Sequence, residues 1–338
     1  MAERLSQLIA PYRAVSIIGM CKNAGKTTAL NSLLRQLAAS GQTLALTSIG
    51  RDGEGTDLVT GTKKPGIYVR EGTLIATAAD LALQHCDVTR EILDTTGIPT
   101  PMGEVVLLRA RSDGAVQLAG PSINSQLARV RDRFFCLGAD RVLIDGALSR
   151  KSLCSRHVTE ATVLCTGASY HKSLDVVVED TAHQCRILTL PETDHALVRR
   201  VGEDSRSVWL FDADGGHELP TGVSVTDELR RCPGANMVFF GGALSDFAVK
   251  PLLMANTLPR ELTLVVRDSS KILLRRENFE KLLRRGIRVQ VLESIHLVAL
   301  TVNPFSAYGY PMDAAQLLEK MGEKVPVPVI DVMKEDGR

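Results

Sequence analysis

Residues 16–31, SIIGMCKNAGKTTALN, contain the residue types of a phosphate-binding loop. Such a loop surrounds phosphates with backbone N–H groups and a helix N-terminus, while a lysine reaches the outer oxygens and a hydroxyl binds Mg²⁺. Gly25, Lys26 and Thr27 supply these parts in that order. We therefore expect a nucleotide site, with Lys26 as a catalytic residue and with the loop residues Lys22, Asn23, Ala24, Gly25, Lys26, Thr27 and Thr28 as its binding residues.

One position departs from the usual motif G-x-x-x-x-G-K-[ST], because Met20 stands in place of the first glycine. Gly19 lies one residue earlier, and the N–H groups that hold phosphate come mainly from residues 23–28, so the prediction stands. Lys22 precedes Lys26 by four residues, whereas the signature lysine of deviant Walker A loops precedes the loop lysine by five. A phosphate-binding Lys22 and a solvated or loop-bracing Lys22 both stay open.

Acidic side chains follow two of the predicted strands. Asp145 ends the run RVLID, and a carboxylate at the carboxyl end of a parallel strand beside a phosphate loop is well placed to hold Mg²⁺. Asp52 is our candidate to touch the metal or to position the attacking water, and Asp57 is a second candidate. Thr27, Asp145 and Asp52 are thus the predicted metal ligands. The alternatives are a strand-capping acid at 145 and loop-turn aspartates at 52 and 57.

Two further loops are candidates for contacts with the nucleotide base. The stretches 266–271 and 302–309 each follow a predicted strand, and Asp268 and Asn303 carry polar groups that read a purine edge. The chain has no N-K-x-D motif, which is the main mark of a GTPase. ATP, together with Mg²⁺, is therefore the expected cofactor.

The elements on either side of the loop are those that its motif requires. AVSIIG, residues 14–19, is typical of a buried strand. In the helical pattern that follows, one face carries leucines, and Gly41 is placed to end the helix. These leucines are Leu30, Leu33, Leu34 and Leu37. A Gly/Asn turn carrying a solvated lysine would not explain both flanks.

Along the whole chain, β-branched runs alternate with helical patterns, as in βαβ units. We predict an α/β fold: a P-loop NTPase with a mostly parallel central sheet, plus a second α/β half. Residues 50–72, with six glycines, are expected to form a long loop, and residues 103–120 a hairpin with a Ser-Asp-Gly turn. Further strands are expected at 43–48, 140–147, 161–168, 185–191, 207–213, 236–243, 262–268, 287–293 and 296–304, and the clearest further helix at 276–286.

The polar stretch 192–207 marks the predicted domain boundary. Residues 1–200 are expected to form the nucleotide-binding domain. Residues 201–338 are expected to form a second α/β domain or to extend the same sheet.

Charge and cysteine content restrict the partners. Forty basic and 39 acidic residues give a formal net charge of +1, so no whole-molecule field favours nucleic acid or an anionic membrane. No apolar run approaches the roughly 18 residues that span a bilayer. Seven cysteines without a C-x-x-C pair are typical of reduced thiols in a cytoplasmic protein. The close pairs Cys154/His157 and His183/Cys185 lack the second half that a closed metal site needs.

Four segments together carry a family resemblance. They are GMCKNAGKTTALN, residues 46–78, AGPSINSQL at 119–127 and LIDGALSRKS at 143–152. In these segments the chain resembles the ATPase component of the lysine 5,6-aminomutase reactivase, to which ornithine 4,5-aminomutase systems are related. The phosphate-loop core is also similar to the molybdopterin-guanine dinucleotide protein B and dethiobiotin synthetase branch of P-loop proteins.

The resemblance implies a cytoplasmic P-loop ATPase that serves an adenosylcobalamin-dependent radical enzyme. Such mutases inactivate themselves when the cofactor radical is quenched, and a reactivase uses ATP to open the mutase and exchange the cofactor. The implied partners are the aminomutase and a MutS-like reactivase component. Asn23, Gly25, Lys26 and Thr27 of the loop, and Asp145, match the family pattern.

Two other functions stay open. The first is an ATP-dependent ligase or kinase of the dethiobiotin-synthetase type, for which Lys63, Lys64, Arg150 and Lys151 are candidate acceptor-binding groups. For Lys63 and Lys64, contacts to phosphate or to a partner and plain solvation are further interpretations. The second is a nucleotide-sensing module that does not hydrolyse ATP.

Overall fold

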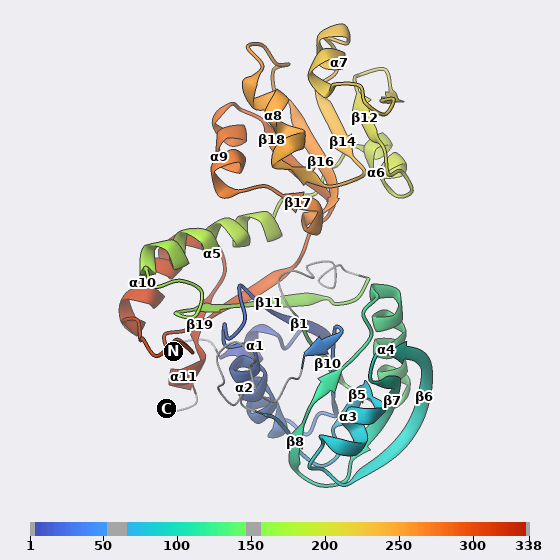
Figure 1. Cartoon of the computed structure of the whole chain (residues 1–338), viewed down its shortest axis with the longest axis vertical. Coiled ribbons are helices and arrows are strands. Elements are labelled where there is room, and N and C mark those ends of the chain that lie inside the picture. Colours follow the sequence, from blue (N-terminus) through green and yellow to red (C-terminus); the bar gives the residue numbers. More distant parts are fainter. Residues whose placement is uncertain (1–3, 53–65, 147–156, 336–338) are drawn as a thin grey trace. The chain divides into compact units, whose positions relative to one another are not determined.

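The computed structural model describes residues 4–52, 66–146 and 157–335 (Figure 1). It has an α/β fold whose main sheet is mixed and mostly parallel. The chain divides into two compact units, residues 1–185 with 296–338 and residues 186–295. In the described parts of the chain, no helix is both long enough and apolar enough to span a membrane.

The main sheet of the first unit has the strand order β20-β19-β11-β1-β10-β2-β5-β7-β6. The seven strands from β20 to β5 are parallel, and β7 runs antiparallel to β5 and β6. β1 (Ala14–Gly19) lies between β10 (Arg141–Asp145) and β11 (Ala161–Gly167), and every residue of these three strands is buried. Continuous burial explains their largely apolar sequences. The other strands are β2 (Leu44–Ser48), β5 (Leu74–Ala78), β6 (Arg90–Thr100), β7 (Gly103–Ala110), β19 (Leu297–Asn303) and β20 (Val329–Asp331).

Helices of the first unit cover this sheet. α2 (Lys26–Ala38) packs on β1 and β10, and the predicted leucine face, Leu30, Leu33, Leu34 and Leu37, is buried as expected. Gly41 follows the helix with a φ of 72°, the left-handed conformation for which glycine is favoured. The remaining helices are α1 (Leu5–Leu8), α3 (Ala79–Gln84), α4 (Asn124–Cys136), α5 (Leu174–Leu188), α10 (Ala314–Lys324) and α11 (Val332–Glu335). Two small antiparallel sheets join β3 (Arg51–Asp52) to β9 (Leu118–Ala119) and β4 (Ile67–Val69) to β8 (Gly114–Val116).

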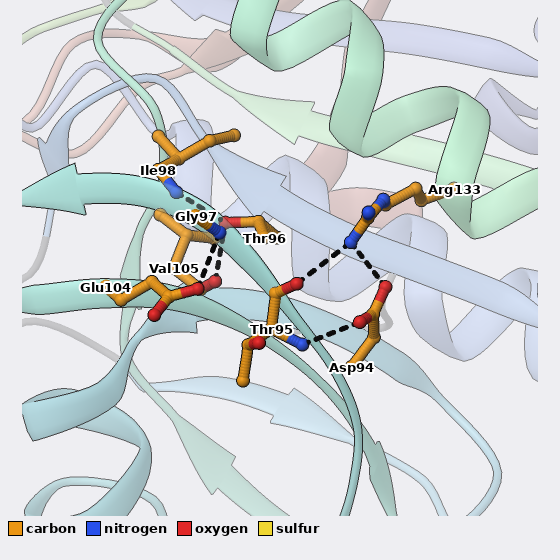
Figure 2. Close-up of polar contacts among 8 residues, drawn as sticks. All are labelled: Asp94, Thr95, Thr96, Gly97, Ile98, Glu104, Val105 and Arg133. Carbon is orange, nitrogen blue, oxygen red and sulfur yellow. Dashed lines mark hydrogen bonds and ion pairs between the residues drawn. The ribbon is translucent and has the colours of Figure 1, made fainter.

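The edge strand β6 is irregular where α4 crosses it (Figure 2). Arg133 of α4 forms an ion pair with Asp94 of the strand. The Thr96 hydroxyl donates to the Val105 carbonyl at 2.7 Å, and Gly97 adopts a φ of 70°. Such bulges bend an edge strand and break its regular row of unpaired backbone groups, so β6 is a poor template for pairing with another chain.

The second unit contains a five-stranded sheet with the order β13-β12-β14-β16-β18. β14, β16 and β18 are parallel, and β12 is antiparallel to both of its neighbours. Phe279 and Leu282 of the predicted helix 276–286 are buried in its core. Its elements are α6 (Ala196–Gly202), β12 (Val208–Phe211), β13 (Gly216–Glu218), α7 (Val225–Arg231), β14 (Met237–Phe240), β15 (Leu244–Ser245), α8 (Asp246–Met254), β16 (Thr263–Asp268), η2 (Ser269–Lys271), β17 (Ile272–Leu273), α9 (Arg276–Arg284) and β18 (Arg288–Glu293).

Three local predictions are wrong. Residues 103–120 do not form a hairpin, because both edges of β7 are occupied by β5 and β6 and β8 pairs with β4. Residues 185–188 end the helix α5, since Cys185 and Leu188 belong to a buried helical face that includes Val177 and Thr181, whereas Arg186 is exposed. A short apolar run alone does not separate a strand from a helix. Within the predicted long loop 50–72, residues 51–52 form β3 and residues 67–69 form β4, which pairs with β8, whereas residues 53–65 lie outside the described part of the chain.

The domain limits also differ from the predicted division at residue 200. The second unit begins at Arg186 and ends at Ile295. The chain then returns to the first unit, because β19 pairs with β11 and β20 pairs with β19. The second unit is therefore inserted into the first, and the C-terminal residues extend the main sheet.

Asp246 offers a test of how the second unit is held together. Hydrogen bonds from Asn278 and from Arg275 hold the pKa of the Asp246 carboxyl below its usual value. The stabilisation that these bonds give is therefore present at neutral pH and is lost as the pH falls through the acidic range. We expect Asp246→Asn to lower the melting temperature at pH 7, and we expect this deficit to shrink steadily in acid.

The measurement is thermal unfolding of the full chain at several pH values. Asp227→Asn is the matched control, because Asp227 forms an exposed ion pair with Arg230 within one helix. A deficit for Asp246→Asn that stays constant from neutral to acidic pH would contradict the charge-dependent role.

Candidate functional site

The carboxyl ends of the central parallel strands meet at one edge of the main sheet. Residue pairing places Asp145 opposite Ile17 of β1 and opposite Ser48 of β2, and Gly19 opposite Cys165 of β11. The connection after β1 leads toward β2, whereas the connection after β11 leads toward β19 on the other side. Ligands of open α/β sheets bind at such a reversal, outside the carboxyl ends of the strands. The predicted loop begins at this place.

The loop from Met20 to Gly25 joins β1 directly to α2. The Met20 N–H donates to the Cys165 carbonyl at 2.9 Å, which ties the start of the loop to the neighbouring strand. Asn23 and Gly25 adopt positive φ values of 61° and 93°, and Gly25 is the N-cap of α2. The first N–H groups of a helix have no partner within the helix, and they form the positive end of its dipole. Lys26, the first residue of α2, therefore stands at an electropositive end.

Lys26 folds back over the end of β1. A Cβ atom at Gly19 would lie 2.9 Å from Lys26 Cγ and 3.1 Å from Cδ, so the glycine provides the room for the lysine chain. The ammonium group also acts on two thiols of the loop region. Burial raises the pKa of Cys21 to about 11 and that of Cys165 to about 12, and in both cases the Lys26 charge lowers the pKa in part. Lys26 thus lies at the loop rather than out in solvent.

Asn303, at the end of β19, lies against the helix start. A Cβ atom at Gly25 would lie 3.1 Å from Asn303 Cβ and 3.5 Å from its Nδ2. The Asn303 side-chain oxygen accepts a hydrogen bond from the Phe305 N–H at 3.0 Å, and its carbonyl accepts one from Ala168 at 2.9 Å. The predicted nucleotide-binding residues 25 and 303 are therefore neighbours, although they are far apart in the sequence.

Asp145 is buried at the carboxyl end of β10, with 5% of its surface exposed. Its carbonyl accepts from the Ile49 N–H at 2.9 Å, and the next residue, Gly146, donates to the Ile17 carbonyl at 2.9 Å. The Lys26 ammonium group lowers the pKa of the Cys165 thiol, whereas the Asp145 carboxylate raises it. Both charges therefore act on the same thiol. The structure therefore brings Asp145 and Lys26 to one region of the sheet edge.

The sequence did not reveal how closely residues 118–120 approach the end of β2. A Cβ atom at Gly120 would lie 2.0 Å from the Ser48 carbonyl oxygen. The buried Ser48 hydroxyl donates to the Gly50 carbonyl at 3.0 Å and accepts from the Gly120 N–H at 3.2 Å. The Gly-Pro pair in AGPSINSQL is the local signal of this constraint. The close approach of Gly120 to Ser48 fixes the chain directly before β3.

The other candidate residues have different positions. Lys22 is exposed, and Ala24 is buried under the loop. Asp52 belongs to β3, where its backbone pairs with Leu118, and its side chain lies outside the described residues. Asp268 belongs to the second unit, where its carboxylate accepts from the Ser270 N–H at 2.7 Å and caps η2. Asp57, Lys63, Lys64, Arg150, Lys151 and Cys154 also lie outside the described residues.

The donors at the sheet edge are of the kinds that bind Mg²⁺. Asp145 offers a carboxylate, and Thr27, in the first turn of α2, offers a hydroxyl. Hard cations prefer such oxygen ligands, and Mg²⁺ keeps several waters when one or two carboxylates and a phosphate complete its shell. The donor set is therefore suited to a magnesium–phosphate complex.

A scan against protein-family models finds no match, and a search of curated proteins finds none either. The chemistry of the site is therefore inferred from the geometry of its own residues.

The position of the Lys26 ammonium predicts the reactivity of Cys21. Removing a positive charge near a thiol raises the thiol pKa and lowers the fraction of reactive thiolate at a given pH. We expect Lys26→Met to slow alkylation of Cys21 at pH 8–9 by about two- to tenfold. The exposed Cys136 serves as the internal reference.

Peptide mapping by mass spectrometry after timed alkylation gives both rates in one sample. Lys22→Met is the matched control, since it removes the same charge from the exposed residue next to Cys21. A Cys21 rate that responds to Lys22→Met and not to Lys26→Met would contradict the observed position of the Lys26 chain.

Proposed function

We propose that this chain is a P-loop ATPase that binds Mg·ATP and reactivates an adenosylcobalamin-dependent amino acid aminomutase. The proposal that the chain binds a nucleotide rests on the loop at residues 20–25, with Lys26 folded over Gly19 and with Asp145 at the end of the adjoining strand. The client is proposed from the resemblance of residues 14–190 to reactivase ATPases.

In the proposed complex, the phosphates lie over the loop and the first turn of α2. The N–H groups between Asn23 and Thr28 point toward them, and Lys26 neutralises the charge of the outer oxygens. Thr27 and Asp145 hold Mg²⁺, directly or through water. The metal supplies charge neutralisation as the bond to the outer phosphate breaks. Asn303 is proposed to contact the nucleotide, because it packs against Gly25.

Asp52 is proposed to position the attacking water or to touch the metal. It lies four residues after Ser48, the last residue of β2, and its backbone is fixed by pairing with β9. β9 is in turn fixed by the close approach of Gly120 to Ser48. A segment tied so closely to the strand end is a suitable place for a residue that responds to a change at the phosphate.

The tests given below also distinguish the reactivase proposal from two alternative functions. A ligase or kinase of the dethiobiotin-synthetase type would turn ATP over with a small-molecule acceptor and without protein partners. A nucleotide-sensing module would bind ATP and never hydrolyse it. The reactivase proposal differs from both, because a reactivase that waits for its client is slow alone and fast in the presence of the mutase and the MutS-like component.

Substitutions at Lys26 and Asp145 separate phosphate binding from metal binding. Lys26→Met removes a charged hydrogen-bond donor worth about 1.5–3 kcal/mol, so we expect ATP affinity to fall roughly 10–100-fold. Asp145→Asn keeps the shape but removes the metal-binding charge, so we expect ATP binding to lose most of its dependence on Mg²⁺. Calorimetric titration with ATP, with and without Mg²⁺, measures both effects.

Lys250→Met is the control for Lys26→Met, because it removes an equal charge from an exposed position of α8 in the second unit. ATP affinity that survives Lys26→Met unchanged would contradict the proposed site. Turnover of ATP is then compared for the chain alone and for the chain with aminomutase and MutS-like partner. Stimulation that Lys26→Met abolishes is the result expected of a reactivase, and fast turnover without partners would contradict that role.

A further inference from the structure

Three potential metal ligands converge in the second unit. His217 lies on the short strand β13, Glu228 lies on α7, and Cys232 is the C-cap residue of α7. One ligand atom from each of them lies within 4.8 Å of the other two. No part of the proposed nucleotide site uses these side chains.

The local structure explains why they converge. Glu228 and Cys232 are four residues apart, which places them on one side of the helix end. The Cys232 N–H donates to the Glu228 carbonyl at 2.9 Å, so the helical turn that relates them is closed. His217 reaches them from the hairpin, in which Leu210 of β12 pairs with His217 of β13. Two rigid elements therefore present the three donors.

The distances are a few tenths of an ångström longer than those between the ligands of a tetrahedral zinc ion. With Zn–N and Zn–O of about 2.0 Å and Zn–S of about 2.3 Å, such ligands lie roughly 3.3–3.5 Å apart. Here His217 Nε2 lies 3.8 Å from Glu228 Oε1, and Cys232 Sγ lies 3.9 Å from the same oxygen. The first distance is too long for a good hydrogen bond, whereas a shift of a few tenths of an ångström would suit a shared ion.

A neighbouring cation orients the carboxylate. Arg231 Nη1 lies 3.3 Å from the other oxygen of Glu228, Oε2. Oε1 is thereby left on the side of His217 and Cys232. Outer partners of this kind fix the orientation of metal-binding carboxylates in many sites.

We propose that His217, Glu228 and Cys232 form a binding site for a divalent transition metal of the zinc type. Thiolate, imidazole and carboxylate together select such an ion over Mg²⁺ or Ca²⁺, which prefer oxygen ligands alone. Three protein ligands leave the fourth position of a tetrahedral ion for water or for an outside ligand. The side chain of His217 is 46% exposed, so that position is open to solvent. The ion would clamp the hairpin to α7.

The test is calorimetric titration of the reduced, metal-free full-length chain with zinc chloride, in the absence of nucleotide. We expect one zinc ion per chain, and we expect His217→Gln and Cys232→Ser each to weaken binding at least about tenfold. Cys136→Ser and His195→Gln are the matched controls and should leave the affinity unchanged. His217 is exposed, whereas Cys232 is partly buried against the core of the second unit, so a melting curve of each variant is recorded to show whether folding is retained.

Two further measurements identify the ligands without relying on affinity. Zinc should slow alkylation of Cys232 and leave that of Cys136 unchanged. Cobalt(II) should give a thiolate-to-metal absorption band with the wild type and lose it with Cys232→Ser. Zinc binding at the same affinity in the His217→Gln/Cys232→Ser double variant would overturn the proposal, as would the absence of zinc binding in the wild type. Loss of ATP binding in Lys26→Met bears on neither result.

Discussion

The site at the sheet edge depends on one steric constraint: β1 must end within a few ångströms of the start of α2. The absence of a Cβ at Gly19 gives the Lys26 chain room to return over the strand end, and the absence of a side chain at Gly25 lets Asn303 approach without crowding. The positive φ of Gly25 is also costly for other residues. The buried strands β10 and β11 hold β1 on both sides, so the loop starts from a rigid frame, to which the Met20 N–H also ties it.

This frame is completed by residues from opposite ends of the chain. The loop lies near the N-terminus, whereas Asn303 arrives after the whole second unit, which is inserted between α5 and β19. The connection that leaves the second unit therefore leads directly into β19, the strand that ends against Gly25.

Much of the local pattern around the loop could be predicted from the sequence. The strand at 14–19 and the leucine face of α2 are confirmed, because a buried strand and an amphipathic helix leave clear signals in short windows. Other features depend on contacts between residues that are far apart in the sequence. They are the pairing of β7 with β5 and β6, the strand β4 and the insertion of residues 186–295. A Ser-Asp-Gly turn indicates a change of direction, but it does not say which strand edge is free. The contact of Gly120 with Ser48 leaves only a local signal, the Gly-Pro pair, and that signal does not identify Ser48 as the partner.

The histidines and cysteines show why spacing along the chain is a weak guide to metal sites. His183 and Cys185 are near neighbours in sequence, but both lie in α5, and residues two apart on a helix point in different directions. Glu228 and Cys232 look less suggestive, yet a spacing of four places them on one face, and the fold of the hairpin adds His217. A closed zinc finger can be recognised in a sequence by repeated short spacings between its ligands, because the two ligands of each pair are close together in the chain. In a site shared between a hairpin and a helix end, only two of the three ligands are close together in the sequence. The third ligand can be identified only from the folded structure.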